Sequence, residues 1–442
     1  MKNIVFIVIL FFPCLLNAQD LPVYKAIQYD ASKVEGYFFL TFRDNIIIID
    51  KNANVVYYKT FHETVNDVFN FALVRNKRMV FSTSEKLYIM DSTFRLTDSF
   101  ACKNSINFDH HDNIILPDGH LLLLGSEAIK LDLNHYPEYK NIWKKDTLTI
   151  SEAVIQEQDV QTNVLFEWHA KDHFSLTDVD SFYVNRKNFP AWTHSNALAM
   201  DDDGNILLSS RNFCEITKIN HKDGSIIWRF GGKHNEFKFV NCPVPFYGQH
   251  DIKKLPNGHY TLFDNGNNKI SHGARAMEFE LDEKNKVATL IWSYTFDKDM
   301  KSLARGSMQR LENGNTLINF GFVSCDSACF VVVNLKGEKI LQMNGNPTYR
   351  VFNYPALPFQ LHRPVISCFD STGVKYLDAG AGYKTYKWNT GDSTRIIKAS
   401  KIDSYSVFVN YGDGGFISSE KFVIGDISLP CNRGKHAIIE RK

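Results

Sequence analysis

Three histidines occupy related positions in successive copies of a repeated segment. His111 and His250 each stand eight residues before the glycine of a turn, in HDNIILPDG and HDIKKLPNG, and His194 stands ten residues before its turn glycine, in THSNALAMDDDG. Equivalent positions in stacked copies of one unit lie at the same level. A single histidine in a strand is usually structural, but three in this arrangement predict a functional cluster.

Imidazole, guanidinium and amide groups together suit the transfer of an anionic group. A neutral imidazole is a nucleophile near neutral pH, and a second imidazole can move the proton. Arg211 ends the apolar run ILLSS, where its N–H groups would bind a tetrahedral oxyanion, and Asn196 follows His194 by two residues. His110 competes with His111 for one of these places. The predicted catalytic residues are His250, His194, His111 and Arg211, and the predicted substrate-binding residues are Asn196 and His110.

Two other functions would use the same residues. With Asp112 and Asp251 added, the three histidines form a set that suits a metal-dependent hydrolase or lyase. The other alternative is a protein that binds a ligand without turnover. The phosphate-binding pattern GxxxxGK[ST] is absent from the sequence, so a nucleotide donor is not supported. We predict a site with no metal and no cofactor.

The elements that must position these residues are repeated strand–turn–strand units. Asp-Gly or Asn-Gly turns separate apolar runs of strand length, which is the pattern of β-hairpins. Six copies are present, beginning at Glu35, Asn76, Pro117, Asp202, Pro256 and Glu312. Six such units packed radially shelter their edges, so we predict an all-β fold with a six-bladed β-propeller over residues 19–360. The alternative is a sandwich or a stack of small β-domains.

The interval between the third and fourth copies is longer than the others. Its surplus, at about residues 139–188, is polar and charged, and we interpret it as an insertion over one face of the fold. Its aromatic residues and histidines are candidates to line a pocket: Trp143, Trp168, His169, His173 and Phe174.

The two ends of the chain have different patterns. Residues 361–442 carry short, closely spaced strand patterns and resemble immunoglobulin-like modules appended to secreted proteins, in LDAGAGYKTYKWNTGDST. The alternative is that these strands complete the propeller. Residues 1–18 combine Lys2 with the apolar run IVFIVILFFPCLL, the pattern of a signal peptide, with a membrane anchor as the alternative. We expect an exported protein, periplasmic, secreted or at the cell surface, with no membrane span in the mature chain.

Cysteine number and net charge limit the remaining possibilities. Seven cysteines follow the apolar run, and an exported chain can keep disulfides. Three pairs are candidates: Cys325 with Cys329, Cys368 with Cys431, and Cys214 with Cys242. The formal net charge of +1 shows no excess of basic residues, so we predict no nucleic-acid partner.

The combination of motifs resembles the arylsulfotransferase family that uses aryl sulfate donors instead of the nucleotide donor. The matching segments are HHDNIILPDG, FEWHAKDHF, WTHSNALAMDDDGNILLSSRNFCEITKINHKDGSIIWRFGGK, FYGQHDIKKLPNGHYTLFDNGNN and RGSMQRLENGNTLINFG, within residues 109–352. One departure is Ala191, where an acidic residue often stands. The resemblance implies a six-bladed propeller, a phenolic sulfate ester as donor and a phenol as acceptor.

The resemblance also implies a role for each site residue. His250, in GQHD, would be the nucleophile of a ping-pong reaction through a sulfohistidine. His194 and His111 would be acid–base or charge-stabilising groups, Arg211 would bind the sulfuryl oxygens, and Asn196 would assist. The natural substrates and the oligomeric state do not follow from the sequence.

Overall fold

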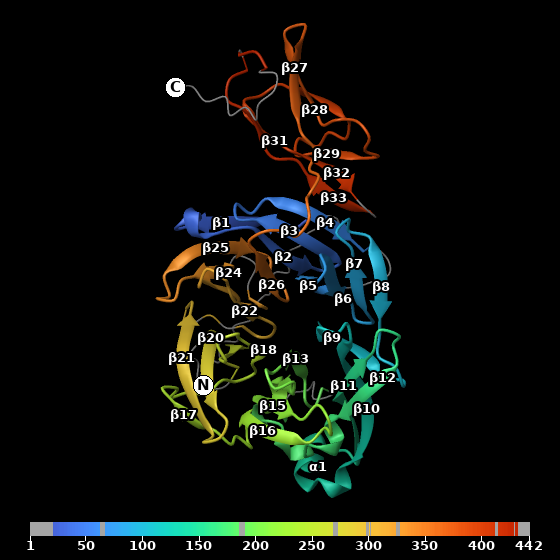
Figure 1. Cartoon of the computed structure of the whole chain (residues 1–442), viewed down its shortest axis with the longest axis vertical. Helices are drawn as coiled ribbons and strands as arrows, with labels where there is room; N and C mark the ends of the chain where they lie inside the picture. The colour runs from blue at the N-terminus through green and yellow to red at the C-terminus, as the bar shows by residue number, and fades with distance from the viewer. Residues whose placement is uncertain are drawn as a thin grey trace, which may run out of the picture.

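The computed structural model describes residues 21–61, 67–184, 191–267, 273–297, 300, 302–323, 328–411, 414–427 and 429–431. The regular structure in these residues is almost entirely β. Small antiparallel sheets follow one another in chain order around a common centre, a propeller-like arrangement (Figure 1). No helix in the described part is both long and apolar enough to span a bilayer. The predicted signal peptide lies outside the described residues.

Four consecutive sheets are simple meanders that begin at the innermost strand and run outward. Their strands are β5 (Phe69–Val74), β6 (Arg78–Ser82), β7 (Leu87–Met90) and β8 (Leu96–Phe100); β9 (Asn107–Ile115), β10 (Leu121–Asp132), β11 (Thr147–Gln158) and β12 (Val164–His169); β13 (Ser195–Met200), β14 (Ile206–Ser210), β15 (Glu215–Ile219) and β16 (Ile226–Gly231); and β18 (His250–Lys254), β19 (Tyr260–Asp264), β20 (Arg275–Asp282) and β21 (Val287–Thr295), with β17 (Lys238–Val240) parallel to β21.

Two further sheets join distant parts of the chain and close the ring. In one, β1 (Tyr24–Gln28) pairs with the last strand of the meander β22 (Ser307–Arg310), β23 (Thr316–Asn319), β24 (Ala328–Val333) and β25 (Lys339–Gly345). In the other, β26 (Val351–Tyr354) precedes β2 (Tyr37–Phe42), β3 (Asn45–Asp50) and β4 (Val55–Thr60). Phe38 of β2 packs against Phe330 of β24 with ring centroids 5.0 Å apart, so an apolar cluster also joins the first and last sheets.

The predicted insertion at about residues 139–188 is only partly an insertion. Strands β11 and β12 belong to it, and they extend the sheet of β9 and β10. Trp168 of β12 is buried, and its indole N–H donates to the Gly224 carbonyl at 2.9 Å, so this ring packs in the core. The helices of the described chain are all short: η1 (Ala31–Lys33), η2 (Leu133–His135), α1 (Pro137–Trp143), η3 (Ala170–Asp172), η4 (Leu176–Asp178), α2 (Ser181–Val184) and η5 (Arg211–Phe213).

The C-terminal strands extend away from the ring (Figure 1). They are β27 (Ser367–Ser371), β28 (Val374–Asp378), β29 (Tyr386–Trp388), β30 (Ile396–Ala399), β31 (Asp403–Tyr405), β32 (Val407–Tyr411), β33 (Gly415–Ser418) and β34 (Phe422–Ile424). Strand β33 pairs with β4 of the ring, so one sheet is continuous across the predicted domain boundary. The rings of Tyr58 and Phe416 stack at 5.1 Å across this junction.

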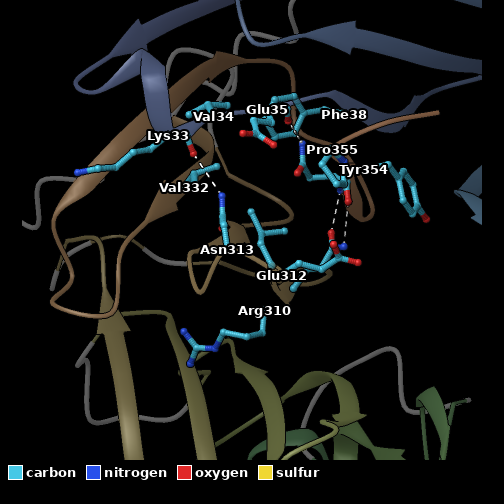
Figure 2. Close-up of a pocket in the computed structure, with 13 residues that line it drawn as sticks. Lys33, Val34, Glu35, Phe38, Arg310, Glu312, Asn313, Val332, Tyr354 and Pro355 are labelled. Atoms are coloured by element: carbon cyan, nitrogen blue, oxygen red, sulfur yellow. Dashed lines mark hydrogen bonds between the residues drawn. The ribbon is translucent and has the colours of Figure 1, made fainter.

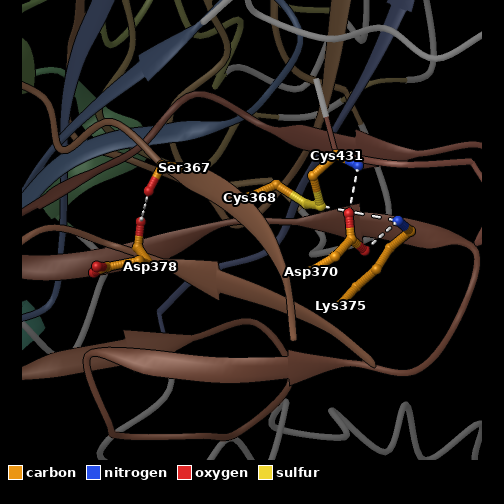
Figure 3. The surroundings of a disulfide bond; sticks show 6 residues. All are labelled: Ser367, Cys368, Asp370, Lys375, Asp378 and Cys431. Atoms are coloured by element: carbon orange, nitrogen blue, oxygen red, sulfur yellow. Dashed lines mark hydrogen bonds and ion pairs between the residues drawn. A yellow bond between two sulfur atoms is a disulfide. The ribbon is translucent and has the colours of Figure 1, made fainter. Parts of the chain in front are cut away.

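One of the three candidate disulfides is present. Cys368 and Cys431 are bonded, with Cα atoms 5.5 Å apart, and Lys375 and Asp370 lie beside them (Figure 3). The Cys214–Cys242 pairing is wrong, because both thiols are free and the Cys242 thiol donates instead to the Val244 carbonyl. Cys325 lies outside the described residues, so its pairing with Cys329 stays a prediction.

Candidate functional site

The predicted histidines lie where the innermost strands depart from regular pairing. In the sheet of β9 and β10, the register shifts between the pairs Asn113–Leu123 and Phe108–Gly125, and His111 lies within this irregular stretch. The register also shifts directly after His250 and after Ser195, the residue next to His194. Bulges of this kind redirect side chains. In these three sheets the bulges lie at or beside His111, His194 and His250, near the start of each innermost strand.

The backbone at these bulges adopts uncommon conformations. His194 has φ 45° and Asp251 has φ 58°, in the left-handed region that non-glycine residues seldom occupy. Gly306 stands at the matching place before β22, where a Cβ atom would lie 2.3 Å from the Phe263 ring. The sixth copy therefore cannot carry a histidine there, and glycine leaves room beside His250, whose strand pairs with that of Phe263.

The structure brings together the four predicted catalytic residues. The rings of His111 and His194 meet edge to face, with centroids 5.1 Å apart. His250 and Arg211 both lie close enough to His194 for their charges to act on it. Three adjacent sheets thus contribute one imidazole each to a single cluster.

The hydrogen bonds of His250 identify its proton-bearing nitrogen. Asn265, at the end of β19, donates its NH2 group to Ser302 Oγ at 2.8 Å and to the Arg305 carbonyl at 2.9 Å. Its Oδ1 therefore faces His250 Nδ1, at 2.7 Å, and must accept a hydrogen bond from the Nδ1–H. His250 Nε2 accepts the backbone N–H of Arg305 at 3.1 Å. The proton is on Nδ1, and the lone pair of Nε2 can react once it gives up the hydrogen bond from the Arg305 N–H.

Burial keeps the central imidazoles neutral. Desolvation, followed by the Arg211 charge, holds the pKa of His250 well below its usual value. Desolvation, with His111 and Arg211, does the same to the pKa of His194. A neutral imidazole keeps the lone pair that nucleophilic attack or proton acceptance requires.

His111 has a different environment, beside a carboxylate. Its Nδ1 lies 2.5 Å from Asp109 Oδ1. Burial raises the pKa of Asp109, but the charge and hydrogen bond of His111 outweigh burial and lower it. Asp109 thus stays ionised and fixes the orientation of the His111 ring through Nδ1, an arrangement suited to acid–base work.

His110 lies in an aromatic stack beside the cluster. Its ring stacks on Phe69 with centroids 3.9 Å apart and on His111 at 4.5 Å. Desolvation and the neighbouring His111 lower the pKa of His110 to about 3. The side chain predicted as an alternative to His111 therefore presents a neutral, flat surface.

Arg211 and Asn196 are held by main-chain groups. Arg211 donates to the Leu303 carbonyl at 3.1 Å and lies over the Tyr183 ring, 4.8 Å from its centroid. The Asn196 NH2 group donates to the Gln249 carbonyl at 2.7 Å. Asn196 therefore anchors the residue before His250 with one N–H of its amide.

The two aspartates that follow His111 and His250 bind cations of the chain itself. Arg350 contacts Asp112 at 2.8 Å and Asp251 at 3.3 Å, and Lys253 contacts Asp112 at 3.1 Å. Burial raises the pKa of Asp112, but Arg350 and Lys253 outweigh it and lower that pKa to about 2. Arg350 therefore contacts both carboxylates of the alternative metal set.

Two other groups in the described residues have spacing compatible with a metal ion. One is Asp109 with His110 and His111, and the other is Glu127 with Glu152 and His169. In the second group, Lys171 contacts Glu127 at 2.8 Å and Glu152 at 3.0 Å, so its positive charge already balances part of the carboxylate charge. In the first, Asp109 already bonds to His111.

Two cavities differ in their relation to the histidines. A cavity of about 530 Å³ lies at the far ends of β22 and β26, lined among others by Arg310, Asn313 and Tyr354 (Figure 2). A smaller one, of about 190 Å³, is lined by Phe69, Arg305 and Tyr349. The second adjoins the histidines, because Phe69 stacks on His110 and Arg305 bonds to His250.

Several residues of this site were not predicted from the sequence. Asp109 directly precedes the two adjacent histidines, which is a usable signal. Asn265 could have been suspected because it ends the hairpin that starts at His250. No such signal marks Arg305, Tyr349 and Arg350, since they lie in the irregular segments that precede β22 and β26, strands of two other sheets.

Comparisons with known proteins support one family. No curated protein matches the chain at a significant level. Similar solved structures include a Bacteroides caccae protein of unknown function (13% identity, TM-score 0.47, 72% of this chain and 98% of that chain). Another is a catalytically inactive variant of virginiamycin B lyase from Staphylococcus aureus with quinupristin (9% identity, TM-score 0.39, 80% and 95%). Neither informs function at this level of similarity. The model of the family Arylsulfotransferase (ASST) matches residues 23–350, and the chain belongs to this family.

Proposed function

We propose that this protein transfers a sulfuryl group from a phenolic sulfate ester to a phenolic acceptor, by a ping-pong reaction through a sulfohistidine at His250 and without a nucleotide donor. Family membership supports aryl sulfotransferase activity with small-molecule donor and acceptor substrates. The observation that carries the finer assignment is the hydrogen bonding of His250, which leaves Nε2 with a lone pair beside His111, His194 and Arg211.

In the first half-reaction, His250 Nε2 gives up its hydrogen bond from the Arg305 N–H and attacks the sulfur of the donor. A bond forms between nitrogen and sulfur, the bond between sulfur and the aryl oxygen breaks, and its electron pair leaves with that oxygen. Protonated His111, stabilised by Asp109 at 2.5 Å, gives the leaving oxygen its proton. The Arg305 N–H that holds Nε2 at 3.1 Å then lies beside the sulfuryl oxygens, where an oriented donor stabilises negative charge.

In the second half-reaction, a phenol replaces the first product. His111 takes the phenolic proton, the oxygen attacks sulfur, and the bond between sulfur and nitrogen breaks. The electron pair returns to His250 Nε2, which restores the starting state. Arg211 supplies positive charge near the sulfuryl group, and neutral His194 supplies a further polar contact. Asn196 acts through the Gln249 carbonyl, which it holds at 2.7 Å.

The proposal extends to architecture and location. We propose six blades, because apolar clusters join each of the ring sheets to the next, and an immunoglobulin-like unit for the C-terminal strands. We also propose residues 1–18 as signal peptide, residues 19–360 as propeller and residues 361–442 as the C-terminal domain. Export is supported by the Cys368–Cys431 disulfide, a bond that persists in oxidising compartments.

A transfer assay tests the proposed activity. The protein is incubated with 4-nitrophenyl sulfate with and without phenol, and release of nitrophenolate is followed. We expect release that depends on phenol, and its loss in His250→Ala but not in the exposed variant His135→Ala. Release that requires an added metal would favour the metal-dependent hydrolase or lyase. No release with any phenol, from protein whose cooperative melting shows that it is folded, would favour a protein that only binds its ligand.

A further inference from the structure

The cavity of about 190 Å³ shares its walls with the histidine cluster. It is formed by the β2–β3 hairpin and by the segments before β5, β22 and β26. Its Phe69 stacks on His110 at 3.9 Å, and the Tyr349 ring lies 6.0 Å from that of His111. Its Arg305 donates its backbone N–H to His250 Nε2 at 3.1 Å. A molecule in this cavity would therefore lie next to the proposed reacting nitrogen.

Two guanidinium groups in the cavity wall have no carboxylate partner. Among the described residues, neither Arg43 nor Arg305 forms an ion pair or a side-chain hydrogen bond. The guanidinium carbon of Arg43 lies 5.3 Å from the Phe42 ring centroid, and that of Arg305 lies 5.8 Å from the centroid of Phe322 and 6.0 Å from that of Tyr349. This contrasts with the paired Arg350. An arginine left unpaired beside a cavity is available to bind an anion.

The carboxylate of Asp67 lies near both arginines, and that of Asp44 lies close enough to act on Asp67. Burial raises the pKa of Asp67, and the charges of Arg305 and Arg43 oppose that rise. Both guanidinium groups are thus within electrostatic reach of one point in the cavity. With Asp44 included, the formal charges balance, so an anion would be bound through the N–H donors that the two arginines leave unused and not through an excess of charge.

The walls and the charges together define a ligand class. Phe69 and Tyr349 line the cavity and offer aromatic contacts to a ring, and His110 supports Phe69 from behind by stacking on it. The volume exceeds the ~150 Å³ of a cavity that binds benzene. We propose that this cavity binds the aromatic ring of the substrate and that Arg43 and Arg305 bind a carboxylate on that ring. The substrates are then hydroxyaryl acids and their sulfate esters, an inference that rests on the proposed function and makes it more specific.

Equilibrium binding tests this inference without requiring turnover. Calorimetric titration compares 4-hydroxybenzoate with 4-hydroxybenzamide, which has nearly the same shape and no charge. We expect the acid to bind about tenfold more tightly, as for one charge-assisted contact. Arg43→Gln and Arg305→Gln should each remove most of this preference, and the exposed control Arg78→Gln should keep it. Equal binding of acid and amide, or a preference that survives in both variants, would overturn the inference.

The same pair used as acceptors separates this inference from the proposed function. Faster transfer to the acid than to the amide, with a ratio that falls in Arg43→Gln, supports both. Arg43 is the cleaner variant, because it has no contact with His250. Selective binding of the acid with no transfer to any phenol would contradict the transferase and leave the anion site. Transfer without selective binding would leave the transferase and overturn the anion site.

Discussion

At the scale of single residues, the amide of Asn265 decides which nitrogen of His250 can react. Its NH2 group is directed towards Ser302 and the Arg305 carbonyl, so its oxygen must face Nδ1. Without this contact, Nδ1 would keep only the Gly248 carbonyl, at 3.2 Å, as acceptor, and the ring that carries the reactive lone pair would be held less firmly. Asn265 is therefore a positioning residue.

Replacing Asn265 separates positioning from folding. We expect Asn265→Ala to lower kcat about 10- to 100-fold, the range found when groups that orient a reactive histidine are removed. Asn265→Asp keeps the acceptor oxygen and should retain more activity. Its negative charge raises the pKa of His250, so the acidic limb of its pH–rate profile should move to higher pH. An unchanged profile in Asn265→Asp, with a normal melting curve, would contradict this role.

The neutral buried imidazoles also make stability depend on pH. Desolvation lowers the pKa of His194 and His250 in the folded chain, whereas unfolded histidine titrates near 6.5. Below that pH the unfolded chain binds protons that the folded chain does not. Their contribution to stability is therefore complete above pH ~6.5 and is lost as the pH falls.

Denaturant titrations at pH 7 and pH 5 measure this loss. We expect the free energy of unfolding to fall by at most about 1.4 kcal/mol per pH unit for each of these histidines. His194→Gln should reduce the slope, and His135→Gln, at an exposed position, should not change it. A slope unaffected by His194→Gln would refute the assignment.

At the scale of elements, one arginine ties the inner strands together. Arg350 precedes β26 and pairs with Asp112 of β9 and Asp251 of β18, and it also donates to the Asn196 carbonyl of β13. These contacts hold the bulged starts of the inner strands at fixed separations. The geometry of the histidines therefore depends on a buried ionic group that does not itself touch them.

Removal of Arg350 should be costly. Arg350→Met leaves Asp112 and Asp251 buried without their main partner, and we expect a loss of about 3–5 kcal/mol in the free energy of unfolding. The matched control is Arg395→Met, which breaks the exposed pair with Asp378 and should leave the melting midpoint unchanged. Equal effects of the two variants would show that Arg350 has no special role.

At the scale of the whole molecule, the C-terminal strands are attached to the ring by one strand pair and closed by one disulfide. Strand β33 pairs with β4, and the Cys368–Cys431 bond spans a sequence separation of 63 residues. A cross-link of this span restricts the unfolded chain strongly. It lies far from the histidines along the chain, so its effect belongs to stability.

Reduction of the disulfide should therefore act on melting and not on transfer. We expect Cys368→Ser with Cys431→Ser to lower the stability of the C-terminal strands by roughly 2–4 kcal/mol, with transfer rates at 25 °C unchanged. Thermal melting with and without dithiothreitol checks this. Wild type should respond to the reductant and the double variant should not; a response of the double variant would contradict the assignment.

Local patterns predicted much of this fold and part of the site. The Asp-Gly and Asn-Gly turns gave the hairpins, and the repeated position of His111 and His250 brought their rings to one cluster. Contacts between distant segments were beyond such patterns, as with Arg350 and Asp112, 238 residues apart. The pairing of β33 with β4, across the expected domain boundary, was not predicted for the same reason.

The most direct test of the central claim is the identity of the modified residue after reaction with donor alone. Protein treated with 4-nitrophenyl sulfate, without acceptor, is digested and its peptides are examined by mass spectrometry. We predict a sulfuryl group on His250 that disappears on addition of phenol and is absent from His250→Asn. Transfer that proceeds with no adduct at His250, or with the adduct on another residue, would contradict the account.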